Sequence, residues 1–477
     1  MAVKSKPERL VGITVLPEYI QSEGIDAVLH NVVDKAHATA VTTSPYLMEE
    51  ATEIDGQREP PDDGKAGDVR LLDRSLWNKR ELWVRTVPSF VPNTHAYRGL
   101  RYQPSKPSAL THQSGRLLNE FIEAAHERGI LVLLQIQAAI PPGYRVQFGG
   151  PDLDDRPRLP DGRLAPAVLC KNGSLASPEI LAYQSALISD LCHAYPDIDG
   201  LRFDWPEYPP YFLDTAFTDF GSHAGAAAKR LGFDFEAMRR DAQSLYKKLH
   251  GGLSDRGLSA WLDTGAGLLP WVALLTERPG LSELARFKAA LVKKLVEHFR
   301  QAMDEAGAKD KQLLLNAFPP PWNAVSGMDY HQVAPHSTGI GVKLYTMHWP
   351  MMIRAYGDQL LAANPDLSSG LLARTLAKMI DIDDDGLTRI EDYTYPPPNA
   401  PHPVGAKAQA RKIRQAQSDA GRTPVFSLAH GYGPIDDFER RLRAAYDAST
   451  HGVWINRYGY LSDTKLDVIG SLSAGKD

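Results

Sequence analysis

Short runs of apolar residues recur along the chain, and most of them are followed by a segment whose apolar residues repeat with a helical period. This pattern is typical of parallel βα units, in which a strand buried on both faces leads into an amphipathic helix. Eight strands are predicted in this way, at residues 11–16, 38–43, 129–137, 199–209, 312–318, 339–345, 423–428 and 451–456.

Amphipathic helices are predicted between several of these strands. Residues 25–36 and 178–193 are two of them. A third places the apolar residues of 118–125 on one face and ends at Gly129, a residue type that favours the C-terminal cap. The longest, 284–303, repeats its apolar residues every 3.6 positions over about six turns, which predicts a helix on the outside of the fold.

Eight strands with intervening helices favour an α/β fold of the (β/α)8 TIM barrel type, predicted as a single domain over 1–477. An open doubly wound sheet is disfavoured because no G-x-G-x-x-G fingerprint follows the first strand. Residues 258–262 could form a strand instead, which would change the number of strands counted between the fourth and fifth units. Long insertions interrupt the repeat after the second and fourth strands, at about 47–113 and 209–280, and the first is expected to stand over the carboxyl end of the barrel.

Composition narrows the classes of protein that fit. The 477 residues include 53 Lys and Arg against 58 Asp and Glu, which gives a net charge of −5. Proteins that bind nucleic acids usually carry an excess of positive charge to neutralise phosphates, so a nucleic-acid binder is not expected. No apolar stretch approaches the roughly 18–20 residues of a membrane span, and the start of the chain has no signal-peptide core. A cytoplasmic protein with two reduced cysteines, and with neither nucleic acid nor membrane as a partner, is expected.

Two carboxylates follow the fourth strand, where a barrel places its functional side chains. Asp204 and Glu207 are three residues apart within Asp-Trp-Pro-Glu-Tyr-Pro. At a strand end such a spacing can put one carboxylate in the pocket and leave the other close enough to change its pKa. Glycoside hydrolysis needs a pair of this kind, with one acid for the leaving oxygen and one carboxylate as nucleophile, base or cation stabiliser.

Residues 199–209 resemble the fourth-strand signature of barrel glycoside hydrolases, in particular bacterial hypothetical glycosyl hydrolases. They are more distantly similar to chitinase-type enzymes, whose pattern Asp-Gly-x-Asp-x-Asp-Trp-Glu-Tyr-Pro has its Glu as acid. Arg202 replaces an acidic residue of that pattern, and Pro206 is inserted before the Glu. Residues 343–349 weakly resemble the sixth-strand motif of the same enzymes. The resemblance implies a glycosidase barrel and leaves the sugar, the anomer and the linkage open.

Further residues at predicted strand ends and in loops suit a carbohydrate pocket. Flat rings stack on the apolar faces of sugars, and amide, imidazole and charged groups bind hydroxyls. Gln135 and Gln137 are two positions apart on one strand, so they are expected to face the same side. The predicted substrate-binding residues are Glu18, Trp83, Tyr97, Gln135, Gln137, Trp205, Tyr208, Asn316, Lys343, Tyr345, His348, Trp349, His430, Asn456 and Arg457.

The sequence does not show which second carboxylate would take part in catalysis. The seventh strand, where many retaining barrel glycosidases carry a Glu, offers only His430. Either Asp204 and Glu207 work alone, or a partner comes from elsewhere, such as Glu18 or Asp263. The leading hypothesis is a glycoside hydrolase with Glu207 as proton donor. Its rivals are a carbohydrate-binding barrel without catalysis and a sugar-acid lyase or isomerase with Lys343 or His348 as base.

No metal and no cofactor are predicted. Residues 381–392 fit the spacing of a calcium-binding loop, but Arg389 stands at the ninth position and Ile390 at the tenth, so a charged surface turn is the preferred interpretation. Zinc spacings such as H-E-x-x-H, the G-x-S-x-G elbow and a phosphate-binding loop do not occur in the sequence. The predicted partner is a small carbohydrate or glycoside.

Overall fold

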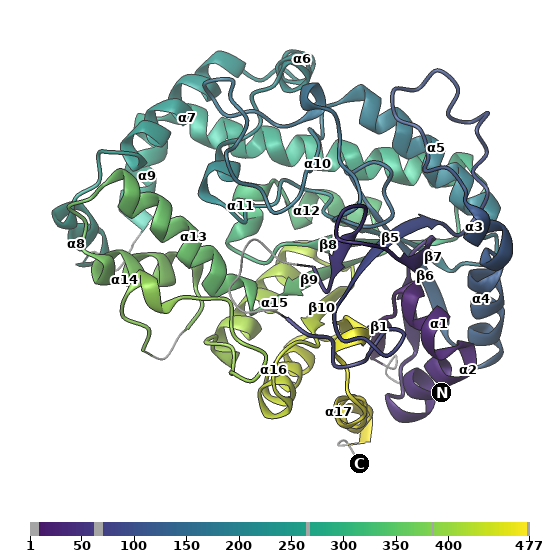
Figure 1. Ribbon diagram of the computed structural model, residues 1–477. Helices are drawn as coiled ribbons and strands as arrows, with labels where there is room; N and C mark the ends of the chain where they lie inside the picture. Colours follow the sequence, from purple (N-terminus) through teal and green to yellow (C-terminus); the bar gives the residue numbers. More distant parts are fainter. Residues whose placement is uncertain (1–8, 62–69, 264–267, 384–385, 475–477) are drawn as a thin grey trace, which may run out of the picture.

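The computed structural model describes residues 9–61, 70–263, 268–383 and 386–474 (Figure 1). Eight parallel strands form a closed barrel in the order β1-β11-β10-β9-β8-β7-β6-β2, and β1 pairs with β2 to close it. The predicted (β/α)8 TIM barrel is confirmed, and each predicted strand overlaps one barrel strand. The barrel strands are β1 (Leu10–Thr14), β2 (Ala40–Thr43), β6 (Leu131–Gln137), β7 (Gly200–Asp204), β8 (Gln312–Ala317), β9 (Gly339–Leu344), β10 (Val425–His430) and β11 (Gly452–Asn456).

Helices connect the strands and surround the barrel (Figure 1). A π-helical segment, His30–Lys35, continues α2. The α-helices are α1 (Pro17–Glu23), α2 (Ile25–Leu29), α3 (Ala109–Ser114), α4 (Leu117–Glu127), α5 (Pro178–Ala194), α6 (Ser222–Leu231), α7 (Phe235–Leu249), α8 (Asp255–Asp263), α9 (Leu268–Glu277), α10 (Pro279–Glu305), α11 (Trp322–Ser326), α12 (Tyr330–Val333), α13 (His348–Ala363), α14 (Ser369–Ile380), α15 (Ala406–Ala420), α16 (Ile435–Ala448) and α17 (Asp463–Ala474).

The long helix α10 shows why the apolar period predicted an outer helix. Its apolar face is buried, and the ring of Phe299 stacks on Phe203 of β7 with centroids 4.0 Å apart. Its flanks pack against α5 and α7, which lie beside it in the upper part of Figure 1. Residues 258–262 belong to α8, so the alternative strand is wrong: the segment packs as a helix against α14.

The insertion after β2 contains a second, small sheet. Its antiparallel strands are β3 (Tyr46–Glu50), β4 (Gln57–Glu59) and β5 (Leu82–Pro88), in the order β3-β5-β4. Because β3 begins three residues after β2 ends, this sheet extends from the carboxyl end of the barrel strands. The insertion is thereby anchored next to the end at which barrels carry their sites.

Inside the barrel, a polar layer lies beneath the carboxyl end of the strands. The buried Arg202 of β7 donates from Nε to Asn316 Oδ1 at 2.7 Å and from a terminal nitrogen to Thr42 Oγ1 at 3.1 Å. Its guanidinium carbon lies 4.7 Å from the ring centroid of Trp454. Burial lowers the pKa of Arg202 to about 10, so the group stays charged at neutral pH. This arginine is a core residue that joins β7 to β8 and β2.

Two expectations from composition can be compared with the described part of the chain. Cys170 is half-buried and Cys192 is buried, and both thiols are free, as predicted. Among the described residues, no helix has the length and apolar character needed to cross a membrane.

Candidate active site

A cavity of about 160 Å³ opens at the carboxyl end of the barrel strands. We call it the mouth cavity. It is lined by residues at the ends of β6, β7, β10 and β11 and by the loops that follow β2, β6, β7 and β9. The residues predicted from the sequence that line it are Gln135, Gln137, Asp204, Trp205, Tyr345, His348, His430, Asn456 and Arg457.

Asp204 and Lys343 form an ion pair at the floor of the mouth cavity. Asp204 is the last residue of β7, and its side chain is 13% exposed. Its Oδ1 lies 2.8 Å from Nζ of Lys343, which extends from β9 and is 1% exposed. The ammonium group also lies 5.0 Å from the ring centroid of Phe318. A buried ammonium group therefore stands directly behind the carboxylate that reaches the cavity.

Trp205 separates Asp204 from the loop beyond it and has an unusual backbone. Its φ is +57°, in the left-handed region that residues with large side chains rarely adopt. A conformation of this kind costs about 1–3 kcal/mol and persists only where its surroundings impose it. The indole ring lies 5.4 Å from the ring of Tyr211 and 5.2 Å from Lys343 Nζ. These contacts fix an aromatic wall directly beside the carboxylate.

The neighbouring strand β6, which pairs with β7 and has Gln137 in register with Asp204, adds polar side chains to the cavity. Gln135 and Gln137 both line the cavity, which confirms that they face the same side. Gln135 Oε1 accepts a hydrogen bond from Asn316 Nδ2 at 3.3 Å. Gln137 is 3% exposed, and its buried Oε1 has no partner among the described residues. A buried acceptor of this kind is costly unless a bound molecule supplies a donor.

A network of buried charges holds the first insertion at the rim of the cavity. Arg145, from the loop after β6, donates to Glu18 Oε1 at 3.0 Å and also pairs with Glu59 at the end of β4. Glu59 pairs in turn with Arg457, which follows β11. Glu18 is fully buried, and burial raises its pKa, while the positive charge of Arg145 lowers it. Glu18 is therefore a partner of Arg145 and does not line the cavity.

Glu207 lies outside the mouth cavity. Its side chain is fully buried; Oε1 accepts from the Phe318 amide at 2.7 Å, and Oε2 accepts from the Ser326 hydroxyl. Burial raises its pKa to about 7, an effect opposed by Lys343 and by these two donors and reinforced by Asp204. Both oxygens connect the loop after β7 to the segment after β8. This burial argues against the predicted transfer of a proton from Glu207 directly to a sugar in the cavity.

The raised pKa of Glu207 gives a testable dependence of stability on pH. A carboxyl whose pKa rises from 4.5 to about 7 on folding stabilises the fold fully below pH 4.5, and the contribution is lost as the pH rises through 7. The shift corresponds to about 3 kcal/mol. In Glu207→Gln the amide cannot ionise, so this loss should disappear. Urea unfolding at pH 5 and pH 8 measures it, with the exposed Glu120→Gln as the matched control.

Equal losses of stability in the wild type and in Glu207→Gln between the two pH values would show that Glu207 is ionised in the folded protein. Because the amide can still accept from Phe318 and donate to Ser326, the variant should fold. A fall in turnover of roughly 10²–10⁴-fold at unchanged stability would instead show that Glu207 transfers a proton in the reaction, as the sequence alone suggests.

Several other residues predicted to bind substrate lie elsewhere. Tyr97 is fully buried and donates to Asp190 of α5 at 3.0 Å, so this part of the first insertion packs on α5. Pro61 and Arg70, which belong to the same insertion, line the mouth cavity instead. Five more predicted residues do not line the cavity: Trp83, Tyr208, Asn316, Lys343 and Trp349. Trp83 lies in β5, Tyr208 donates a hydrogen bond to Asp219, and the ring of Trp349 lies next to that of Trp322. Asn316 and Lys343 contact lining residues instead, Asn316 by a hydrogen bond to Gln135 and Lys343 by its ion pair with Asp204.

Other lining residues were not predicted. Tyr144, Arg145 and Gln147 come from the loop after β6, and Tyr211 comes from the loop after β7. The run Tyr208-Pro-Pro-Tyr211 just beyond Asp204 is a sequence signal that could have indicated Tyr211. Arg145 has no comparable signal, because its position depends on how a long loop folds back toward Glu18.

The two remaining predictions concern a metal and a second carboxylate. Asp385 of the calcium-like spacing lies outside the described residues, and among those described no group of three or more His, Cys, Asp or Glu side chains could hold a metal ion. Asp263 ends α8, is exposed, and does not line the mouth cavity. Neither Glu18 nor Asp263 therefore presents a carboxylate to the cavity.

Comparisons with known proteins concern the fold. No family model matches the sequence, and no curated protein matches it. The chain is similar to the PgaB (BpsB) glycoside hydrolase domain of Bordetella bronchiseptica (13% identity, TM-score 0.48, covering 97% of this chain and 99% of the other). It is also similar to the β-amylase catalytic domain of Paenibacillus polymyxa (9% identity, TM-score 0.48, covering 97% of this chain and 96% of the other). A third similar structure is a family 18 N-acetylglucosaminidase of Paenibacillus barengoltzii (11% identity, TM-score 0.40, covering 97% of this chain and 99% of the other). These three similar structures are glycoside hydrolases.

Proposed function

We propose that the protein is a glycoside hydrolase whose mouth cavity binds a sugar and whose Asp204 faces the anomeric carbon. One observation supports this most strongly: among the described residues that line the cavity, Asp204 is the only carboxylate, and Nζ of Lys343 lies 2.8 Å from its Oδ1. An ionised carboxylate in that position stabilises a developing oxocarbenium ion or attacks it as a nucleophile.

The walls of the cavity suit a sugar ring. Trp205, Tyr211 and Tyr345 offer aromatic faces for its C–H groups. The unpartnered Oε1 of Gln137 accepts a hydrogen bond from a hydroxyl, and Asn456 adds an amide at the end of β11. A volume of about 160 Å³ fits one ring more readily than several, so the proposal places a single saccharide unit here.

The proton for the leaving oxygen needs a donor that reaches the cavity. His348 and His430 line it, and imidazole is the side chain whose ordinary titration range best suits proton transfer near neutral pH. Nδ1 of His430 accepts from the Tyr432 amide at 3.1 Å, so the neutral ring carries its proton on Nε2. In this proposal an imidazole replaces the second carboxylic acid of the usual glycosidase pair.

A second candidate is a lyase or isomerase that acts on a sugar acid. It is favoured by Arg145 and Arg457, which line the same cavity and, although they pair with Glu18 and Glu59, bring two guanidinium groups to where a carboxylate of the substrate would bind. His348 would then be the base. Lys343 is less suited to that role, because its ammonium group is buried and paired with Asp204.

A panel of 4-nitrophenyl glycosides and unsaturated-product assays on uronates tests both functions. Activated aryl glycosides come first because their good leaving group makes a proton donor less important. Release of nitrophenolate above the uncatalysed rate supports the hydrolase. Formation of an unsaturated uronate without hydrolysis supports the lyase. If sugars bind in calorimetry but no substrate is turned over, both proposals fail and the protein is a binding barrel.

A further inference from the structure

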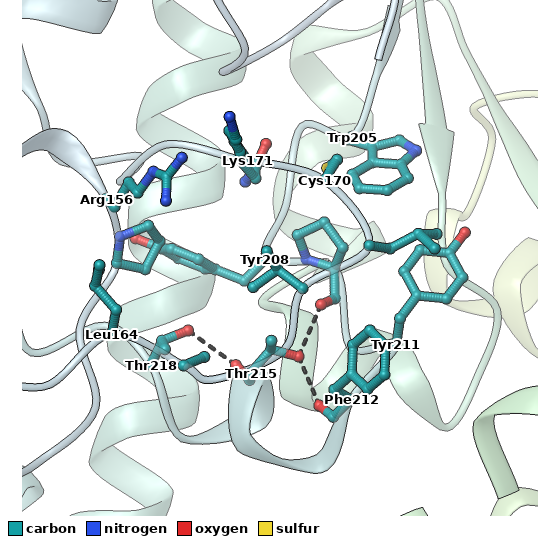
Figure 2. Close-up of a pocket in the computed structure, with 16 residues that line it drawn as sticks. Arg156, Leu164, Cys170, Lys171, Trp205, Tyr208, Tyr211, Phe212, Thr215 and Thr218 are labelled. Atoms are coloured by element: carbon teal, nitrogen blue, oxygen red, sulfur yellow. Dashed lines mark hydrogen bonds between the residues drawn. The ribbon is translucent and has the colours of Figure 1, made fainter. Parts of the chain in front are cut away.

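A second cavity, of about 90 Å³, adjoins the mouth cavity between the loops that follow β6 and β7 (Figure 2). We call it the side cavity. Leu169, Trp205 and Tyr211 line both cavities, so the two share a wall next to Asp204. A molecule that reacts at Asp204 therefore has a second compartment beside it, on the far side of the Trp205 ring.

The walls of the side cavity are mainly apolar. Cys170 contributes a thiol whose pKa burial raises well above its usual value, so it stays protonated. The hydroxyls of Thr215 and Thr218 donate hydrogen bonds to backbone carbonyl oxygens, and Figure 2 draws these bonds as dashed lines. Because the two hydroxyls are engaged in this way, they add little polarity to the cavity. Apolar side chains that line it include Pro157, Leu164, Val168, Leu169 and Phe212.

Two cations stand at one end of this apolar space. Figure 2 shows Arg156 and Lys171 on the side away from Tyr211. Neither of the two has an ion-pair partner within the described ranges, and no described lining residue is a carboxylate. Nε of Arg156 is buried without a hydrogen-bond acceptor in the same part of the chain. A buried donor on a charged group is costly unless an acceptor, best an anionic one, is bound.

A second polar group of the lining also lacks a partner. Asn172 is 8% exposed; its Nδ2 donates to the carbonyl oxygens of Gly173 and Glu207, both at 3.3 Å. Its buried Oδ1 has no donor among the described residues. The side cavity thus combines apolar walls, a cation that needs an acceptor and an amide oxygen that needs a donor. A flat ring with an anionic group and a hydroxyl satisfies all three.

We propose that the side cavity binds the leaving group of the substrate, and that this group is a single aromatic ring that carries a carboxylate. The identification as a leaving group rests on the glycosidase proposal, because it places the bond to be cleaved between the two cavities, beside Asp204. Hydrolysis then releases a phenolic hydroxyl, which can donate to Asn172, while the carboxylate accepts from Arg156. The apolar walls favour an aromatic ring over a second sugar.

The test is a titration with 4-hydroxybenzoate, followed by NMR. We expect a dissociation constant on the order of 1 mM for a ligand of this size. The neutral 4-hydroxybenzyl alcohol should bind roughly fivefold more weakly, as should 4-hydroxybenzoate to Arg156→Gln. Arg116→Gln is the matched control: it removes one positive charge from a side chain that is 87% exposed and does not line the cavity, and it should leave the affinity unchanged.

Ala165→Trp fills the side cavity from a half-buried loop position and should abolish binding of both ligands. Binding of 4-hydroxybenzoate that survives this change would overturn the site. Equal affinities for 4-hydroxybenzoate and 4-hydroxybenzyl alcohol would show that the site does not recognise a carboxylate. Binding of glucuronate that is tighter than that of 4-hydroxybenzoate would show that it does not prefer an aromatic ring. The titration involves no turnover, so its failure is distinct from failure of the glycosidase proposal. If 4-hydroxybenzoate binds but no aryl glycoside is cleaved, the site stands and the glycosidase proposal fails.

Discussion

Asp204→Asn should lower turnover of an aryl glycoside by roughly 10⁴-fold or more, the scale observed when a reacting group is removed from a hydrolase. The amide cannot stabilise the oxocarbenium ion or form a glycosyl ester. Binding of 4-hydroxybenzoate should persist, because the side cavity does not include Asp204. The measurement is kcat with a 4-nitrophenyl glycoside that the wild type cleaves, with the titration as the control for folding.

Rescue by azide separates a nucleophile from a mere counter-ion. In Asp204→Ala the space left by the carboxylate lies beside the Lys343 ammonium group, 2.8 Å from the missing Oδ1, which attracts a small anion. Azide should restore cleavage of an activated substrate and give a glycosyl azide of inverted configuration if Asp204 is the nucleophile. If Asp204→Ala cleaves substrate as fast as the wild type, Asp204 serves only to pair Lys343, and the proposed mechanism is wrong.

The barrel could be predicted from the sequence because its strands carry their own signal. Residues 312–318 and 451–456 are short apolar runs whose strands are buried on both faces, which is the pattern typical of parallel barrel strands. Residues at the strand ends could be placed for the same reason. Asp204, His430 and Asn456 each end a strand, so the closed parallel barrel brings them to one end regardless of the details of packing.

The remaining part of the site depends on contacts between distant loops, and no local pattern encodes them. Tyr97 was expected at the mouth because it is aromatic and lies in a long loop, yet it packs on α5 through Asp190, 93 residues further along the chain. Glu207 follows Asp204 closely, but Trp205 turns the backbone into the left-handed region between them. The side chain of Glu207 consequently points away from the mouth cavity, toward Phe318 and Ser326.

Lys343→Met should destabilise the fold by about 3 kcal/mol at pH 8, because removal of one partner from a buried ion pair leaves the other charge uncompensated. Met retains much of the volume that packs between Trp205 and Phe318, so the loss is chiefly electrostatic. Urea unfolding of the wild type and of Lys343→Met at pH 8 measures this loss.

The double variant Lys343→Met with Asp204→Asn provides the decisive control. If the ion pair carries the effect, removing the second charge should recover most of the stability lost in Lys343→Met, and the two substitutions should couple by more than about 1 kcal/mol. Additive losses would mean that Lys343 acts by packing against the rings of Trp205 and Phe318. Lys343→Met should also slow turnover, because the ammonium group 2.8 Å from Asp204 Oδ1 no longer holds that carboxylate in place.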